Sequence, residues 1–293
     1  MSHLVAIFCD LDDFCKVFEP LYEQRLLAKA AKHRRRQTAL SLSEIMTLVI
    51  DFHRRHYRDF KAYYLLHVWG HLRPYFPKLL SSHRFVELMP RALVALSVYL
   101  QTRLGQSTGI AFIDSTSLSV CHNRRIQSHN VFKHLAQRGK TSMGWFYGFK
   151  LHLLINDEGE LLACRVTAGN VDDRAPVCLL SRGLVGQLFG DKGYISQPLH
   201  DELWGQGLEL LTGIRKNMKP RLLRLWDKLM LRKRAVIEAV NDQLKNISQI
   251  EHTRHRSVTG FMVNVVAGLI AYTYHPTKPS LGLRHQQQLT MID

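Results

Sequence analysis

The sequence contains few cysteines, and none of them forms a paired motif. Its 293 residues include five Cys with no Cys-x-x-Cys spacing, so neither a disulfide framework nor a structural zinc site is expected, and a reducing compartment fits the composition. Asp10, Asp12 and Asp13 stand where a secretory signal would carry positive charge, so export is not indicated. The chain has no internal repeat or low-complexity linker. Because 46% of its residues are hydrophobic, wholesale disorder is excluded.

Acidic residues are also scarce relative to basic ones. Only 24 Asp and Glu stand against 40 Lys and Arg, which gives a formal net charge of +16. Such a chain suits a phosphate backbone, although ribosome-associated and non-specifically adhesive proteins share this property. The basic residues gather at 29–36, 53–61 and 215–234. A solvated helix face explains the 53–61 segment equally well. The residues of the other two segments that we expect to contact DNA are Arg34, Arg35, Arg36, Lys216, Lys219, Arg232 and Lys233.

The pattern of apolar residues changes near residue 105. The residues before it have helical spacing, including a capping box formed by Ser41 and Glu44. After it, short apolar runs predict strands at 110–113, 147–155, 161–167, 187–189 and 208–214, and helices at 172–183, 195–206 and 225–250. The prediction is an α/β fold with a mixed five-stranded sheet flanked by helices, preceded by an all-α N-terminal domain. The expected boundaries are 1–105 for the helical domain, 106–275 for the sheet domain and 276–293 for a tail.

Residues 257–274 form a stretch of 18 residues without a charge. A hydropathy scan would flag it as a membrane span. Because the stretch contains Ser257, Thr259 and Asn264 and no second span accompanies it, we expect a buried core helix and no membrane partner.

Three acids occupy positions that suggest a shared site. Asp114 ends one apolar run and Asp191 follows another, so rigid strands would hold both at a solvent-reachable edge. Glu238 lies on the last long helix before residue 250. With 100° per residue counted from Leu231, Arg234, Glu238 and Lys245 fall at about 300°, 340° and 320° on one strip beside the core. Asp242, at about 20°, is a rival for the third acid.

Three adjacent carboxylates repel one another, and a divalent cation relieves that repulsion. Oxygen-only ligands favour Mg²⁺ or Mn²⁺ over zinc, and two such ions roughly 4 Å apart are a common device for cleaving phosphodiesters. We therefore expect the oxygens of Asp114, Asp191 and Glu238 to lie within roughly 4–8 Å of one another. Arg234 and Lys245 would then contact phosphate. Taken singly, each acid is better explained as a helix cap or a surface carboxylate, and it is the spacing of the three together that favours a shared site.

Several blocks resemble those of insertion-sequence DDE transposases. They are FIDST (112–116), WFYGFKLH (145–152), GNVDDR (169–174) and GDKGY (190–194). The segments 232–245 and 249–257 make the chain similar to the insertion sequence 982 family, and the resemblance extends over nearly the whole chain. Related transposases place Tyr, Arg, Glu and Lys at set intervals on one helix. This sequence has Leu231, Arg234, Glu238 and Lys245, so only the Tyr is missing.

This resemblance implies an RNase H-like core in which Asp114, Asp191 and Glu238 hold Mg²⁺ or Mn²⁺, with two ions. The implied enzyme binds double-stranded DNA at the terminal repeats of its element, hydrolyses the end phosphodiester and joins the freed 3′-OH to target DNA. Synapsis of two ends implies a homodimer or larger assembly on DNA. The implied location is the bacterial cytoplasm, in association with the nucleoid.

Two alternatives remain open at this stage. One is a catalytically silent, basic DNA-binding or regulatory protein, although the intact triad argues against it. The other is an aspartate-nucleophile phosphatase using Asp10, which would require residues 5–8 to form a strand. An acidic helix N-terminus explains Asp10, Asp12 and Asp13 more simply. Asp172 and Asp173 are possible auxiliary ligands, although a turn that caps the next helix is the simpler account.

Overall fold

The computed structural model describes residues 3–28, 38–142, 144–215, 218, 222–251 and 255–283. The chain forms two compact units. The helical unit comprises Met1–Arg103, Asn246–Ile250 and His255–Tyr274, and the sheet unit comprises Leu104–Lys245, Glu251–Arg254 and His275–Asp293. The first boundary lies close to the expected one. The segment 255–274, which we expected to belong to the sheet domain, instead packs with the N-terminal helices.

The helical unit begins with long helices and ends with a helix from near the C-terminus. Its elements are α1 (His3–Ala28), α2 (Leu42–Arg54), α3 (Phe60–Ala62), the π-helical η1 (Tyr63–Leu72), α4 (Ser82–Leu88), the 3₁₀ turn η2 (Met89–Ala92), α5 (Leu93–Thr102) and α10 (Val258–Thr273). The predicted capping box starts α2: the Ser41 hydroxyl accepts from the Glu44 N–H, and the Glu44 carboxylate accepts from the Ser41 N–H.

Helix α10 forms the centre of this unit. It packs against α2 and α5, and most of its residues are buried. Ser257 caps its first turn by accepting from the Gly260 N–H, as expected for a helix that starts at residue 258. The predicted buried helix is therefore confirmed. Among the described residues, no helix is both long and apolar enough to cross a membrane.

Asp10 joins three helices of the helical unit. Its Oδ2 accepts hydrogen bonds from the hydroxyls of Tyr99 (3.0 Å) and Tyr274 (2.8 Å) and from the Arg103 guanidinium (3.2 Å). Residues 5–8, which a phosphatase would need as a strand, lie within α1. The alternative based on an acidic helix N-terminus is also wrong, because α1 starts at His3 and has no acid in its first turn. Asp10 is a structural residue.

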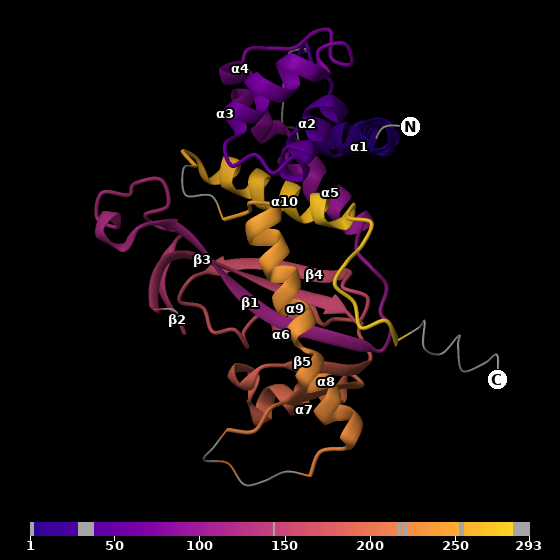
Figure 1. Ribbon diagram of the computed structural model, residues 1–293, viewed down its shortest axis with the longest axis vertical. Coiled ribbons are helices and arrows are strands. Elements are labelled where there is room, and N and C mark those ends of the chain that lie inside the picture. Colours follow the sequence, from indigo (N-terminus) through magenta and orange to yellow (C-terminus); the bar gives the residue numbers. More distant parts are fainter. Residues whose placement is uncertain are drawn as a thin grey trace, which may run out of the picture. The chain divides into compact units, whose positions relative to one another are not determined.

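The sheet unit contains one mixed sheet (Figure 1). Its strands are β1 (Ile110–Cys121), β2 (Gln137–Thr141), β3 (Gly144–Asn156), β4 (Leu161–Ala168), β5 (Gly186–Gly190) and β6 (Leu208–Thr212). Its helical segments are η3 (Asn123–Arg125), α6 (Val177–Leu180), η4 (Lys192–Tyr194), α7 (Gln197–Gly205), α8 (Leu225–Lys233), α9 (Ala235–Asp242) and, at the border with the helical unit, the π-helical η5 (Gln243–Ile247).

Strand directions in the sheet match the RNase H-like arrangement. The order is β4-β3-β1-β5-β6, with β3 antiparallel to both β4 and β1, and with β1, β5 and β6 parallel. This confirms the fold class. The described sheet has six strands rather than five, because β2 pairs with the start of β3 beside β4. Strand β2 has the sequence QRGKT, which lacks the apolar alternation that predicts a strand.

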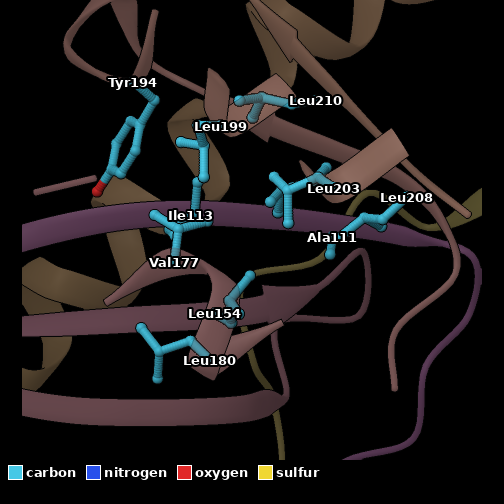
Figure 2. Close-up of a cluster of buried hydrophobic side chains, with 11 residues drawn as sticks. Ala111, Ile113, Leu154, Val177, Leu180, Tyr194, Leu199, Leu203, Leu208 and Leu210 are labelled. Carbon is cyan, nitrogen blue, oxygen red and sulfur yellow. The ribbon is translucent and has the colours of Figure 1, made fainter. Parts of the chain in front are cut away.

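Helices cover both faces of the sheet. On one face, Ile113 of β1 packs with residues of α6 and α7 in the cluster drawn in Figure 2. On the other face, Phe112 stacks on Phe189, and α9 contacts β1 while α8 contacts β5 and β6. Strand β3 is buried on both faces, including His152. It is therefore an interior strand of the sheet.

The predicted helix over 225–250 is interrupted. Helix α8 ends at Lys233 and α9 begins at Ala235, with Arg234 at the junction. There the Ile237 N–H donates to the Arg234 carbonyl three residues back, which makes a tighter turn than an α-helix has. Along α9 and the following η5, Ile237, Val240 and Leu244 are fully buried and form the apolar side of this segment.

Candidate active site

The first two acids lie on adjacent parallel strands. Phe112 of β1 pairs with Phe189 of β5, and Asp114 and Asp191 stand two residues beyond this pair on each chain. Side chains two residues apart point to the same face of a sheet, so both acids continue the face that α8 and α9 cover. Asp191 lies just past β5, where its Oδ1 accepts the Gly193 N–H at 2.8 Å and starts η4. The register therefore brings these two predicted residues together.

The third acid is connected to the first through an arginine. Arg234 Nη2 donates to Glu238 Oε1 at 2.7 Å, and its Nη1 lies 3.8 Å from Asp114 Oδ1. Glu238 sits one turn along α9 from Arg234, which explains their contact. Its side chain is 56% exposed, whereas the side chains of Asp114 and Arg234 are about one-fifth exposed. The guanidinium thus lies between two of the three predicted acids.

Electrostatics connect all three carboxyl groups. Burial raises the pKa of Asp114 to about 6, the Arg234 charge opposes this shift, and the charges of Asp191 and Glu238 add to it. A carboxyl group that is partly desolvated and surrounded by other acids has a high cost of ionisation, which a cation would remove.

Asn241 is a member of this group that sequence reasoning missed. Its Nδ2 donates to Asp114 Oδ2 at 3.1 Å, and its side chain is 8% exposed. At 100° per residue from Leu231 it falls at about 280°, next to Arg234 on the strip that also carries Glu238 and Lys245. This helical position is the feature of the sequence that indicates Asn241. The sequence prediction did not include it because only charged residues were considered for the site.

The donor set suits a hard divalent cation. It consists of carboxylates and one buried amide oxygen, Oδ1 of Asn241, that has no hydrogen-bond partner. As the side chains stand, however, no group of three His, Cys, Asp or Glu residues within the described ranges is close enough to enclose an ion. The Arg234 guanidinium lies between Asp114 and Glu238. Coordination by all three acids would require it to move.

A second polar group adjoins the acids from the α7 side of the sheet. Tyr194 is 2% exposed, and its hydroxyl oxygen lies at the margin of the apolar cluster in Figure 2. Burial, together with the charges of Asp114, Asp173 and Asp191, raises the pKa of Tyr194 well above its usual value. Asp173 also accepts from Lys150 Nζ at 2.9 Å, which holds the GNVDDR turn against β3.

Asp172, in the same GNVDDR turn, is hydrogen-bonded to Arg174 of that turn. Asp172 accepts from both the guanidinium and the backbone N–H of Arg174, and these hydrogen bonds lower the pKa of Asp172 to about 2. The turn precedes α6, which is only four residues long and shorter than predicted. Pro176 directly precedes it. Asp172 therefore stabilises the turn.

Lys245, predicted to contact DNA, forms an ion pair inside the sheet unit. Its Nζ lies 3.2 Å from Glu251 Oε2, and Glu251 Oε1 accepts from the backbone N–H of Ser119 on β1. The pair connects η5 to the far end of β1. Glu251 was not singled out from the sequence, since the pairing depends on the chain turning back after residue 247.

The remaining predicted DNA-binding residues fall into two groups. Arg232 and Lys233 are exposed in the last turn of α8. Arg34, Arg35, Arg36, Lys216 and Lys219 lie outside the described residues. In the 53–61 segment, His53 is buried and contacts the Ser248 carbonyl, while Arg55 pairs with the buried Asp51 at 3.2 Å. Part of that segment is therefore structural.

Comparison with known proteins gives the class. Residues 104–258 match the family described as "Transposase DDE domain". Because this match spans more than half of the 293 residues, the chain belongs to that family and is a DNA transposase of the DDE type. No curated protein matches the chain. A solved structure described as the Mos1 mariner paired end complex with Mn is 9% identical, with a TM-score of 0.25 over 84% of this chain and 82% of that one. A likeness this weak assigns no residue here.

Proposed function

We propose that this protein is the transposase of an insertion sequence of the 982 family, with Asp114, Asp191 and Glu238 as its catalytic residues. The observation that carries the proposal is the sheet register that sets Asp114 beside Asp191, together with the link from Asp114 through Arg234 to Glu238. Oxygen donors favour Mg²⁺ or Mn²⁺, and two ions suit phosphoryl transfer. When bound, such ions would activate the attacking oxygen and neutralise charge on the phosphate.

The chain's own residues would perform three tasks. The carboxylates hold the cations. Arg234, released from Glu238 and Asp114 once those charges are neutralised, is placed to contact a phosphate oxygen, with Lys245, Arg232 and Lys233. Water then attacks the phosphorus at the element end and the bond to the 3′ oxygen breaks, leaving a 3′-OH and a 5′-phosphate. In the second step the 3′-OH attacks a target phosphodiester, forms a new P–O bond and releases the target's own 3′-OH.

The partners proposed for this reaction are double-stranded element ends and target DNA in the bacterial cytoplasm, with a homodimer or larger assembly formed on DNA. The net charge of +16 and the exposed cations of α8 support DNA binding. The proposed DNA surface also includes the cations at 34–36, 216 and 219. The proposed division of labour has residues 1–105 bind the ends, the sheet domain within 106–275 carry the reaction, and 276–293 form a tail.

The test is cleavage of linear DNA that carries the terminal repeats flanking the gene. We expect cleavage with Mg²⁺ or Mn²⁺ and none with EDTA, and we expect Asp191→Asn to abolish cleavage while DNA binding persists in a mobility-shift assay. Asp242→Asn, at the rival third acid that is exposed on α9, should leave cleavage unchanged, and loss of cleavage in this variant would favour Asp242 over Glu238. Unchanged cleavage by Asp191→Asn would refute the assignment, and DNA binding without cleavage in the wild type would support a silent regulatory protein.

A further inference from the structure

Asn241 makes a contact that the three-acid description leaves unused. Its amide Nδ2 donates to Asp114 Oδ2 at 3.1 Å, while Asp114 Oδ1 faces Arg234 at 3.8 Å. One oxygen of this carboxylate therefore accepts a hydrogen bond from Asn241, and the other faces the positive charge of Arg234. Because Asp114 extends from β1 and both partners belong to the α9 region, these contacts orient the carboxylate between the sheet and the helix.

The other atom of the same amide lacks a partner. Asn241 Oδ1 is buried and accepts no hydrogen bond, although the side chain is 8% exposed. A buried acceptor left unpaired is unfavourable, and native structures contain few of them. The orientation of the amide is determined by its neighbour, since only the NH₂ side can donate to a carboxylate. With the NH₂ group directed at Asp114, the amide oxygen points away from it and has no partner.

Helix geometry places this amide with the other site residues. Asn241 lies three residues after Glu238 and seven after Arg234, so all three occupy one face of α9. Residues at these spacings act on the same side of the helix, and here that side meets β1. Among the described side chains of α9, Asn241 is the buried polar one.

We propose that Asn241 is a positioning residue of the divalent-cation site: its NH₂ group holds the Asp114 carboxylate in its binding orientation, and its amide oxygen accepts a hydrogen bond from a water molecule that accompanies the bound cation. This inference rests on the proposed function of Asp114, Asp191 and Glu238. Partners that orient a ligating carboxylate typically change metal affinity by 10–100-fold when they are removed.

Mn²⁺ titration calorimetry on the full-length, metal-stripped protein tests this role. We expect Asn241→Leu to weaken Mn²⁺ binding by roughly 10-fold or more, while Asn246→Leu, the same replacement at an exposed position, leaves it unchanged. Asn241→Ser is the second variant, because it removes the amide group and keeps a small polar side chain at this position. It should weaken binding as Asn241→Leu does.

The outcomes separate the inference from the function on which it rests. Loss of Mn²⁺ binding in Asp191→Asn together with wild-type affinity in both Asn241 variants would overturn the positioning role and leave the transposase site standing. Wild-type protein whose Mn²⁺ binding does not depend on Asp191 would overturn both. A second readout is cleavage: the Mn²⁺ concentration for half-maximal rate should rise in Asn241→Ser by at least as much as binding weakens. If Asn241 only connected α9 to β1, its replacement would lower thermal stability without changing the Mn²⁺ concentration for half-maximal rate.

Discussion

Asp114 combines burial with several neighbouring charges. Its pKa is raised to about 6, chiefly by burial, and Asp191 and Glu238 raise it further against the opposing charge of Arg234. Because the folded-state pKa lies above the unfolded value of about 3.9, ionisation of this group destabilises the fold once the pH rises through that interval. Below about pH 3 both states are protonated, and the penalty disappears.

This predicts that Asp114→Asn stabilises the metal-free protein in a pH-dependent manner. In EDTA at pH 8 the variant should be more stable by on the order of 2 kcal/mol, and near pH 3 the difference should vanish. Chemical denaturation of both proteins at the two pH values measures it. Equal stabilisation at both pH values would mean that ionisation of Asp114 is not the cause. Such a gain alongside lost cleavage would show that the site exists at a cost to stability.

Gly193 leaves room for the carboxylate of Asp191, the second acid of the site. A Cβ at this position would lie 2.9 Å from Asp191 Oδ1, closer than normal contact, and the carboxylate is the part free to move. We expect Gly193→Ala to fold normally and to reduce cleavage by roughly 10²-fold, since a misplacement of about 1 Å can have that effect. The matched control is Gly213→Ala, whose new methyl meets only the flexible Lys192 side chain at 3.3 Å. Equal rates for the two variants would contradict this account.

At the scale of the element, β3 depends on a residue without a side chain. A Cβ at Gly148 would lie 2.0 Å from the Leu118 carbonyl oxygen of β1, a rigid backbone atom. Gly148→Ala should therefore separate β1 from β3 and lower the free energy of unfolding by roughly 1–3 kcal/mol or more. Gly205→Ala at the end of α7 meets nothing within 4 Å and should leave it nearly unchanged. Urea denaturation compares them, and equal stability of the two variants would exclude the steric explanation.

Much of the sheet and the positions of its acids could be predicted from sequence, because buried parallel strands are short apolar runs and their ends are marked by polar residues. The Asp114 and Asp191 positions follow from that rule alone. Strand β2 could not be predicted, since QRGKT has no apolar face and pairs only because β3 is long enough to bind a second partner. Asn241 and Glu251 were missed because their roles depend on contacts with β1. Asn241 is 127 positions from its partner Asp114, and Glu251 is 132 positions from its partner Ser119.

At the scale of the whole molecule, charge should dominate DNA affinity. Each lost phosphate contact lowers the slope of log K against log salt by about 0.9. We expect the pair Arg232→Gln and Lys233→Gln, in the exposed last turn of α8, to reduce that slope by up to about 2 in mobility-shift titrations from low to moderate salt. Arg182→Gln, also exposed but on the α6 side, should not change it. An unchanged slope in the α8 double variant would remove these residues from the proposed DNA surface.

The order in which the units are encoded has a consequence for the gene. The first unit to leave the ribosome lacks its central helix until residues 258–273 have been made. A premature stop just before α10 would therefore leave the N-terminal helices without their central helix, although all of residues 1–103 had been translated. Mutations that end the chain before α10 should therefore behave as loss of the entire protein. During synthesis, the helical unit can complete its core only after residues 258–273 have been translated.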